Sequence, residues 1–332
     1  MATYYYGGQA VIEGVMMRGR RSAAVALRAP AGGILVHEEV LRGRFYGSKA
    51  AQWPFVRGVL LLWDMLILGT RLMMYAANVS MEPLRDEATA VSGASDRAAA
   101  PASGAKDAVP GAVVEANPAA ASALGGAALT GMLVFSLAFA VGLFFLLPLG
   151  TVGALHRWVG SGWQSLVVEG VVRLALLIVY LYIIGRLPSI QRVFEYHGAE
   201  HKAINALEAG DPLDVEHVRR ASRVHTRCGT GFLLIVVVLS IFVFVLVGHP
   251  PVLVLILSRI LLVPVIAALA YELMRLGARY YRLRPVRWLM APSLALQGLT
   301  TREPDASQME CAIVALDRVL RTDGVAVLHR VA

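Results

Sequence analysis

Four segments of the chain are predominantly apolar over the length that a helix needs to cross a bilayer. They lie near residues 124–147, 166–187, 230–248 and 252–273. No Asp, Glu, Lys or Arg lies between Glu115 and Arg157, or between Arg227 and Arg259. Because a membrane-spanning helix needs about 20 apolar residues, each of these gaps can hold one. The pattern predicts two transmembrane pairs, over residues 124–187 and 230–273.

A fifth apolar segment, residues 54–77, carries a regular polar stripe. Arg57, Asp64 and Arg71 are spaced seven apart, which places them on one narrow face of a helix. Two interpretations fit this stripe. The helix lies in the membrane plane or re-enters it with a wetted edge, or it spans the bilayer with the stripe facing a protein interior.

The remaining segments are polar or β-prone. Within residues 1–53, SAAVALRAP and GGILVHEEV are β-prone runs joined by Pro30, Gly32 and Gly33, which predicts a hairpin in a small β-rich domain. Residues 81–122 are rich in Ala, Gly, Ser and Pro and indicate a flexible linker. The predicted fold class is therefore mainly α: a polytopic membrane protein with about four transmembrane helices, one re-entrant or interfacial helix and an N-terminal β-hairpin domain.

Positive charge predicts the orientation of these elements. The segment between the second and third spans, residues 188–229 with the preceding turn, is basic: it carries Arg186, Arg192, Lys202, Arg219, Arg220, Arg223 and Arg227. The C-terminal segment 274–332 and residues 1–53 are also rich in Lys and Arg. Since such residues concentrate on the cytoplasmic side, we expect a plasma-membrane protein with both termini cytoplasmic. Four crossings return the chain to the side of the membrane on which it started, so the segment 54–77 should not cross the membrane.

Composition supports a membrane protein over a soluble domain. The chain of 332 residues is 57% hydrophobic and 16% charged, against about 25% charged residues in ordinary soluble domains. The net charge of +8 would suggest nucleic acid as a partner, but no basic stripe interleaved with aromatic residues is evident. The predicted partner is the lipid bilayer, and no nucleic acid is expected. The two cysteines, Cys228 and Cys311, both fall in predicted cytoplasmic segments, so we expect no structural disulfide.

Charged residues also occur inside the predicted spans. Glu169 and Arg173 are one turn apart in the second span, and Arg259 lies about a third of the way into the fourth. Their depths place all three in one layer, so we expect Glu169 to pair with Arg173 or Arg259. A structural ion cluster is favoured over a transport pathway.

The candidate chemistry lies in the segment 188–229. His197 and His201 are four residues apart on a predicted helix, so both imidazoles project from one face and suit one metal ion. Together with Glu200 they form H-x-x-E-H, the reversed zinc-protease pattern, in which the glutamate acts on water at the metal.

A second pair of ligand types follows closely. His225 and Cys228 add an imidazole and a thiol at the start of the third span, and these donors suit a divalent metal such as zinc. The alternative is that the histidines pack on lipid headgroups and that Cys228 is a small apolar residue. Three histidines, a cysteine and a glutamate within one segment favour the metal site.

Five stretches of the chain resemble the YqhQ-like family, bacterial and plastid membrane proteins described as predicted metal-dependent enzymes. They are YGGQAVIEGVMMRG from Tyr6, PFVRGV from Pro54, EYHGAEHK from Glu195, HTRCGT from His225 and LQGLTTREPD from Leu296. The resemblance extends from residue 6 to about residue 320 without the linker. It implies that Glu13 and Arg18 belong to a polar core with Glu200, His197, His201, His225 and Cys228. Departures from the family pattern occur at Thr226, Gly231 and Ala306.

Three functions remain open from the residues. In the first, the protein is a metal-dependent enzyme, of hydrolase class, in which Glu200 is general base and Glu13 and Arg18 are further candidate catalytic residues. In the second, four protein ligands form a closed structural zinc site in a membrane scaffold. The third is a transporter, which rests only on the charges in the apolar segments. Neither the substrate nor the oligomeric state follows from the sequence.

Overall fold

The computed structural model describes residues 6–29, 32–41, 53–93, 113–115, 126–160, 162–248 and 251–325. The strands are β1 (Gly7–Val11), β2 (Gly14–Arg18), β3 (Ser22–Arg28), β4 (Ile34–Val40) and β5 (Val113–Glu115). The helices are α1 (Val56–Gly93), α2 (Gly126–Val141), the π-helical η3 (Gly142–Leu146), α3 (Leu147–Ala154), α4 (His156–Val159), α5 (Trp163–Ile184), α6 (Pro188–Ala209), α7 (Val215–Arg220), α8 (Gly229–Val247), α9 (Val252–Arg279), α10 (Arg284–Thr300) and α11 (Ala306–Asp323).

The N-terminal strands form one sheet in the order β1-β2-β3-β4-β5. The predicted hairpin is confirmed: β3 and β4 pair antiparallel, with Val25 opposite His37. It is half of a larger unit, because β1 and β2 form a second hairpin around a tight turn at Ile12 and Glu13, where Glu13 has φ 55°. The short β5 adds a parallel edge to β4.

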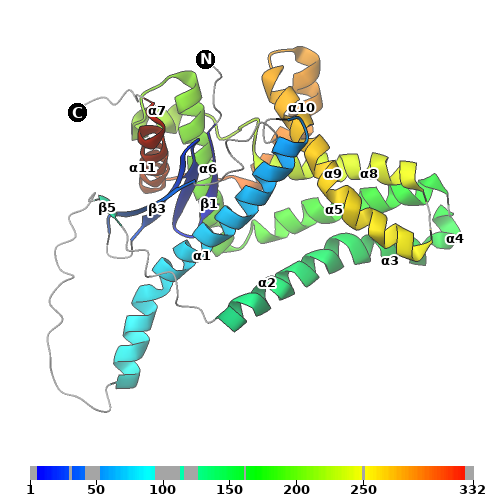
Figure 1. The fold of residues 1–332 in the computed structure, drawn as a ribbon, viewed down its shortest axis with the longest axis horizontal. Coiled ribbons are helices and arrows are strands. Elements are labelled where there is room, and N and C mark those ends of the chain that lie inside the picture. The colour runs from blue at the N-terminus through cyan, green and yellow to red at the C-terminus, as the bar shows by residue number, and fades with distance from the viewer. Residues whose placement is uncertain are drawn as a thin grey trace.

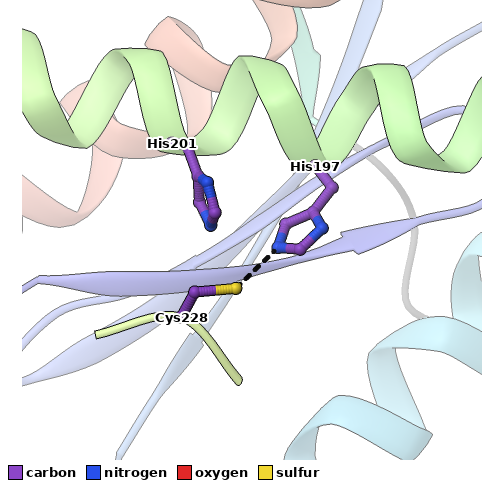
Figure 2. A group of neighbouring side chains, drawn as sticks. All are labelled: His197, His201 and Cys228. Carbon is purple, nitrogen blue, oxygen red and sulfur yellow. Dashed lines mark hydrogen bonds between the residues drawn. The ribbon is translucent and has the colours of Figure 1, made fainter. Parts of the chain in front are cut away.

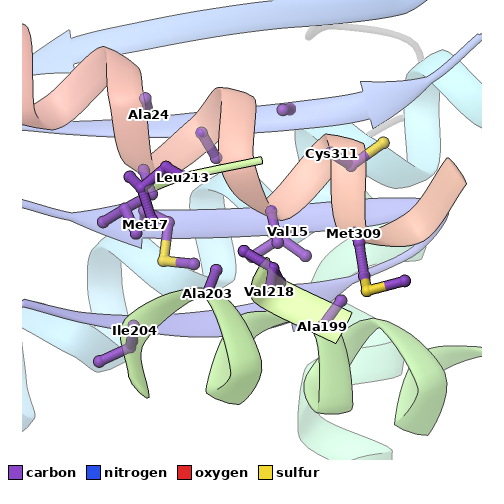
Figure 3. Close-up of a cluster of buried hydrophobic side chains, with 14 of the residues drawn as sticks. Val15, Met17, Ala24, Ala199, Ala203, Ile204, Leu213, Val218, Met309 and Cys311 are labelled. Carbon is purple, nitrogen blue, oxygen red and sulfur yellow. The ribbon is translucent and has the colours of Figure 1, made fainter. Parts of the chain in front are cut away.

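Both faces of the sheet are covered by helices from elsewhere in the chain. On one face, side chains such as Val15 and Met17 pack against α6 and α11, including Ala203 and Met309 (Figure 3). On the other face, neighbouring residues of the same strands pack against α1. Alternate strand residues point to opposite faces, so a strand covered on both sides is buried throughout, as β2 is. The first 53 residues therefore do not hold a core by themselves.

Long apolar helices extend away from this sheet layer (Figure 1). In the described part of the chain, five helices are long and apolar enough, by length and composition, to cross a membrane: Val56–Ser80, Val134–Ala154, Trp163–Ile184, Gly229–Val247 and Leu261–Arg279. These overlap the five apolar segments that the sequence indicates, with the second and the fifth displaced toward the C-terminus. Helix α10 packs against these helices, in contact with α8, α5 and α9.

Helix α1 uses its polar stripe in contacts with the protein. Arg57 forms an ion pair with Glu272 of α9, its Nε lying 2.7 Å from the carboxylate, and Arg71 lies 3.2 Å from Glu39 of β4. At both positions the stripe contacts protein, which is compatible with either interpretation of how this helix meets the membrane. The side chain of Asp64 lies outside the described residues.

The sequence predicts a flexible linker over residues 81–122, but the two described parts of this range are a helix and a strand. Helix α1 continues to Gly93, and residues 113–115 form β5, whereas the rest of 81–122 lies outside the described residues. The edge of β4 offers free backbone groups to any extended segment, so three residues without apolar periodicity can still pair there.

The expected ion pair in the helical bundle is present. Arg173 donates to Glu169 at 2.5 Å and to the backbone oxygen of Phe144 at 2.9 Å, and both charged side chains are buried. The side chain of Arg259 lies outside the described residues.

Removing one partner of this pair should impair accumulation of the protein. Arg173→Met leaves the Glu169 carboxylate buried and uncompensated, which costs about 3–5 kcal/mol in comparable buried pairs. The double variant Glu169→Gln/Arg173→Met should recover accumulation, measured as folded protein after detergent extraction. If the double variant accumulates as poorly as Arg173→Met, loss of this ion pair does not explain the defect of the single variant.

Candidate metal centre

Helix α6 positions the two central histidines. Pro188 occupies its first turn, where a missing backbone N–H costs nothing, and Gly210 ends it in the left-handed conformation at φ 79°. His197 and His201 are one turn apart on this helix, and their ring centroids are 4.4 Å apart. His201 is 1% exposed, so its imidazole is fixed inside the protein.

Backbone carbonyls orient both imidazoles in the same way. Nδ1 of His197 lies 2.8 Å from the oxygen of Thr300, and Nδ1 of His201 lies 2.5 Å from the oxygen of Arg223. A carbonyl oxygen only accepts, so each Nδ1 must carry the proton. Each Nε2 is then left with a free lone pair, which is how metal-binding histidines are usually held.

Cys228 brings a sulfur atom to the same point. It is the N-cap of α8, where its Sγ accepts from the backbone N–H of Thr230 at 3.4 Å, and it also lies 3.4 Å from Nε2 of His197 (Figure 2).

These three residues fit a metal ion. The donor atoms of His197, His201 and Cys228 all lie within 4.8 Å of one another. Zinc binds nitrogen at about 2.0 Å and sulfur at about 2.3 Å, so a tetrahedral site separates the two kinds of ligand by about 3.5 Å. The 3.4 Å between Cys228 and His197 matches this edge. The mixed nitrogen and sulfur donors suit zinc among the divalent metals.

Glu200 lies beside the three donors but is not one of the group. Its Oε2 is 3.8 Å from Nε2 of His197 and 3.9 Å from Nε2 of His201, and the residue is 4% exposed. Burial raises the pKa of Glu200, while His197 and the backbone N–H of Gly8 act in the opposite sense.

Strand β1 therefore docks on the site through Gly8. A Cβ atom at this position would lie 2.8 Å from Cγ of Glu200 and 2.6 Å from the oxygen of Met16, so only glycine lets the strand approach.

His225 is close to the group without joining it. Its ring centroid is 5.6 Å from that of His201, and its buried Nε2 forms no hydrogen bond within the described residues. The carboxylate of Glu208 is 3.9 Å from this atom. Burial lowers the pKa of His225 and favours the neutral ring. The side chain of Gln297 holds its backbone with two hydrogen bonds, of 3.1 and 2.8 Å.

Glu13 and Arg18, the two candidates taken from the resemblance, are not among the converging donors. Glu13 forms an ion pair with Arg192, whose Nη2 is 2.6 Å away, and lies 3.4 Å from the hydroxyl of Tyr196. Arg18 is buried in β2, opposite Gly7 of β1. Glu13 thus links the β1–β2 turn to α6, whereas Arg18 lies within the sheet.

Sequence reasoning missed the part that α10 and the following segment play. Thr300 orients His197, and Gln297 holds the chain three residues before Cys228. The segment after α10 passes so close to α6 that a Cβ at Gly198 would lie 2.0 Å from the oxygen of Arg302. The signal was present, because LQGLTTREPD contains both Gln297 and Thr300.

Comparison with known proteins identifies a family for this chain. The model of the family described as protein of unknown function DUF1385 matches residues 53–322. The chain belongs to the DUF1385 family. A DUF1385 relative, the uncharacterized protein YqhQ of Bacillus subtilis (strain 168), is 29% identical over 324 residues, which is 96% of this chain and 93% of the relative. The resemblance to YqhQ-like proteins is thus confirmed. No solved structure matches the chain.

Proposed function

We propose that the protein is a membrane-embedded, metal-dependent enzyme of hydrolase class whose site faces the cytoplasm. The observation that carries the proposal is the position of Glu200, within 4 Å of both imidazole Nε2 atoms and outside the three-donor group. Three protein ligands leave one position of a tetrahedral metal open, which is typical of catalytic zinc sites. A bound zinc ion would supply a Lewis acid and a water ligand of pKa near 7.

The residues of the chain have separate roles in this proposal. His197, His201 and Cys228 hold the metal, and the carbonyls of Thr300 and Arg223 keep both rings in the correct tautomer. Glu200 accepts and returns a proton at Oε2, as general base and then general acid. Its buried position beside the donors keeps bulk water away from that proton.

The orientation follows from charge and packing. We place the apolar bundle in the plasma membrane with both termini cytoplasmic, because Lys and Arg concentrate in residues 1–53, 188–229 and 274–332. Helix α1 then lies at the interface. Its residues Leu68, Leu72, Tyr75, Ala76 and Val79 are buried against the sheet, so this half is covered by protein and cannot face lipid chains.

A structural zinc site is the second candidate. It is favoured by the position of the donors at the junction of α6 with α8, where a metal would join the sheet layer to the bundle. In that case Glu200 or His225 would complete four ligands, and no position would remain for water.

Cobalt tests the donor set directly. A Co²⁺ ion bound by a thiolate shows a sulfur-to-metal charge-transfer absorption, so titrating the purified protein with Co²⁺ should produce this band. Cys228→Ser should abolish it. Cys311→Ser is the matched control, since Cys311 is buried between α11 and the sheet and should leave the band intact. Loss of the band in both variants, or in neither, would contradict the assignment of Cys228 as ligand.

A further inference from the structure

A cavity lies at the ends of α5 and α10, beside the metal centre. Its volume is about 310 Å³, and Leu181 and Gly185 line it from α5 while Gly298 and Leu299 line it from α10. Gly298 leaves open space here, because a Cβ atom at this position would meet no heavy atom within 4 Å. Two arginines, Arg186 and Arg302, complete the lining.

Within the described residues, both guanidinium groups donate to neutral oxygen atoms. Arg302 donates to the backbone oxygen of Gly185 at 3.3 Å, and Arg186 lies over the ring of Tyr182 and bonds to its hydroxyl. In the part of the chain that the structure describes, neither forms an ion pair with a carboxylate, although neighbouring arginines do. Those pairs are Arg192 with Glu13, Arg223 with Glu303 and Arg227 with Glu208. Two positive charges that share a cavity without a counter-ion favour a phosphate group, which guanidinium binds with paired hydrogen bonds.

The cavity also lies where the apolar surface of α5 ends. The candidate span ends at Ile184, and exposed apolar side chains precede the cavity: Ile178, Val179 and Ile183. Tyr182, which lines the cavity, is of the type that gathers at membrane–water interfaces. An occupant with a phosphate at the arginines would have an apolar surface directly beside it.

We propose that this cavity binds the phosphate headgroup of an anionic membrane lipid. The phosphate lies between Arg186 and Arg302, and the acyl chains follow the exposed face of α5. This assignment rests on the membrane orientation of the proposed function and not on the metal. It also places the headgroup next to the metal centre, because Leu299 and Arg302 flank Thr300, whose carbonyl orients His197.

Lipid titration of the full-length protein in neutral detergent tests the site, with bound lipid counted by native mass spectrometry. The wild type should bind phosphatidylglycerol in preference to phosphatidylcholine. Arg186→Gln/Arg302→Gln should weaken phosphatidylglycerol binding by about tenfold or more, since the charge-assisted hydrogen bonds of both arginines to the phosphate are lost. Gly298→Phe, which fills the cavity and keeps both charges, should weaken it similarly. Arg287→Gln, an exposed arginine of α10 outside the cavity, should bind like the wild type.

Three results would overturn the proposal. They are equal binding of the two lipids, unchanged binding by the double arginine variant, and displacement of the lipid by inorganic phosphate at matched concentration, which would indicate a site for free phosphate. Metal content measured on the same samples separates this inference from the proposed function. A protein that holds metal but shows no lipid preference refutes only the lipid site, and one that binds lipid but no metal refutes only the enzyme.

Discussion

His201→Ala should remove the metal from the purified protein. His201 is the most deeply buried of the three donors, and its Nδ1 is fixed by the oxygen of Arg223. Two ligands remain, and even the loss of a residue that only supports a ligand weakens metal binding by about 10–100-fold. We expect a larger effect here, measured as metal per chain after dialysis.

His217→Ala is the matched control for this variant. His217 lies on the neighbouring helix α7, where its Nδ1 is 2.8 Å from the carboxylate of Asp214, and it makes no contribution to the three-donor group. Its replacement should leave the metal content unchanged. If His201→Ala retains a full complement of metal, the site is elsewhere and the assignment of α6 as its centre is wrong.

Glu200→Gln should keep the metal and abolish function. The amide has the size of the carboxyl group and can still accept a hydrogen bond from the N–H of Gly8, but it can no longer take up a proton. A general base contributes about 10²–10⁴-fold to rate, so the loss should be of that order. Because the substrate is unidentified, the readout is complementation of the phenotype of a deletion strain, with metal content measured on the same variant.

A control variant, and the result that would contradict the enzyme proposal, distinguish the two proposed functions. Glu216→Gln changes an exposed glutamate of α7, paired with Arg220, and should complement fully. If Glu200→Gln complements as well as this control while holding its metal, the enzyme hypothesis fails and the structural zinc site remains. In the structural case, loss of metal should instead lower the thermal stability of the whole sheet layer.

Local sequence patterns were sufficient to predict the apolar helices and the proximity of His197 and His201. Both depend on periodicity along one helix, which the residues themselves carry. The β3–β4 hairpin was predictable for the same reason, since its turn residues lie between two β-prone runs. The pairing of Glu169 with Arg173 also follows from spacing within one helix.

Long-range contacts account for what the sequence left undetermined. Whether His225 or Cys228 joins the two imidazoles depends on how the end of α10 holds the chain between them, through Gln297 and Thr300. The docking of Gly8 on Glu200 depends on a sheet whose faces are covered by helices far along the chain. No local pattern encodes these distances.

X-ray absorption of the metal in wild-type protein purified without chelators tests the central claim most directly. The account predicts about one metal ion per chain, bound by two imidazole nitrogens, one sulfur and one exchangeable oxygen ligand, and the sulfur contribution should vanish in Cys228→Ser. A protein without bound metal, or a metal bound without sulfur, would contradict it.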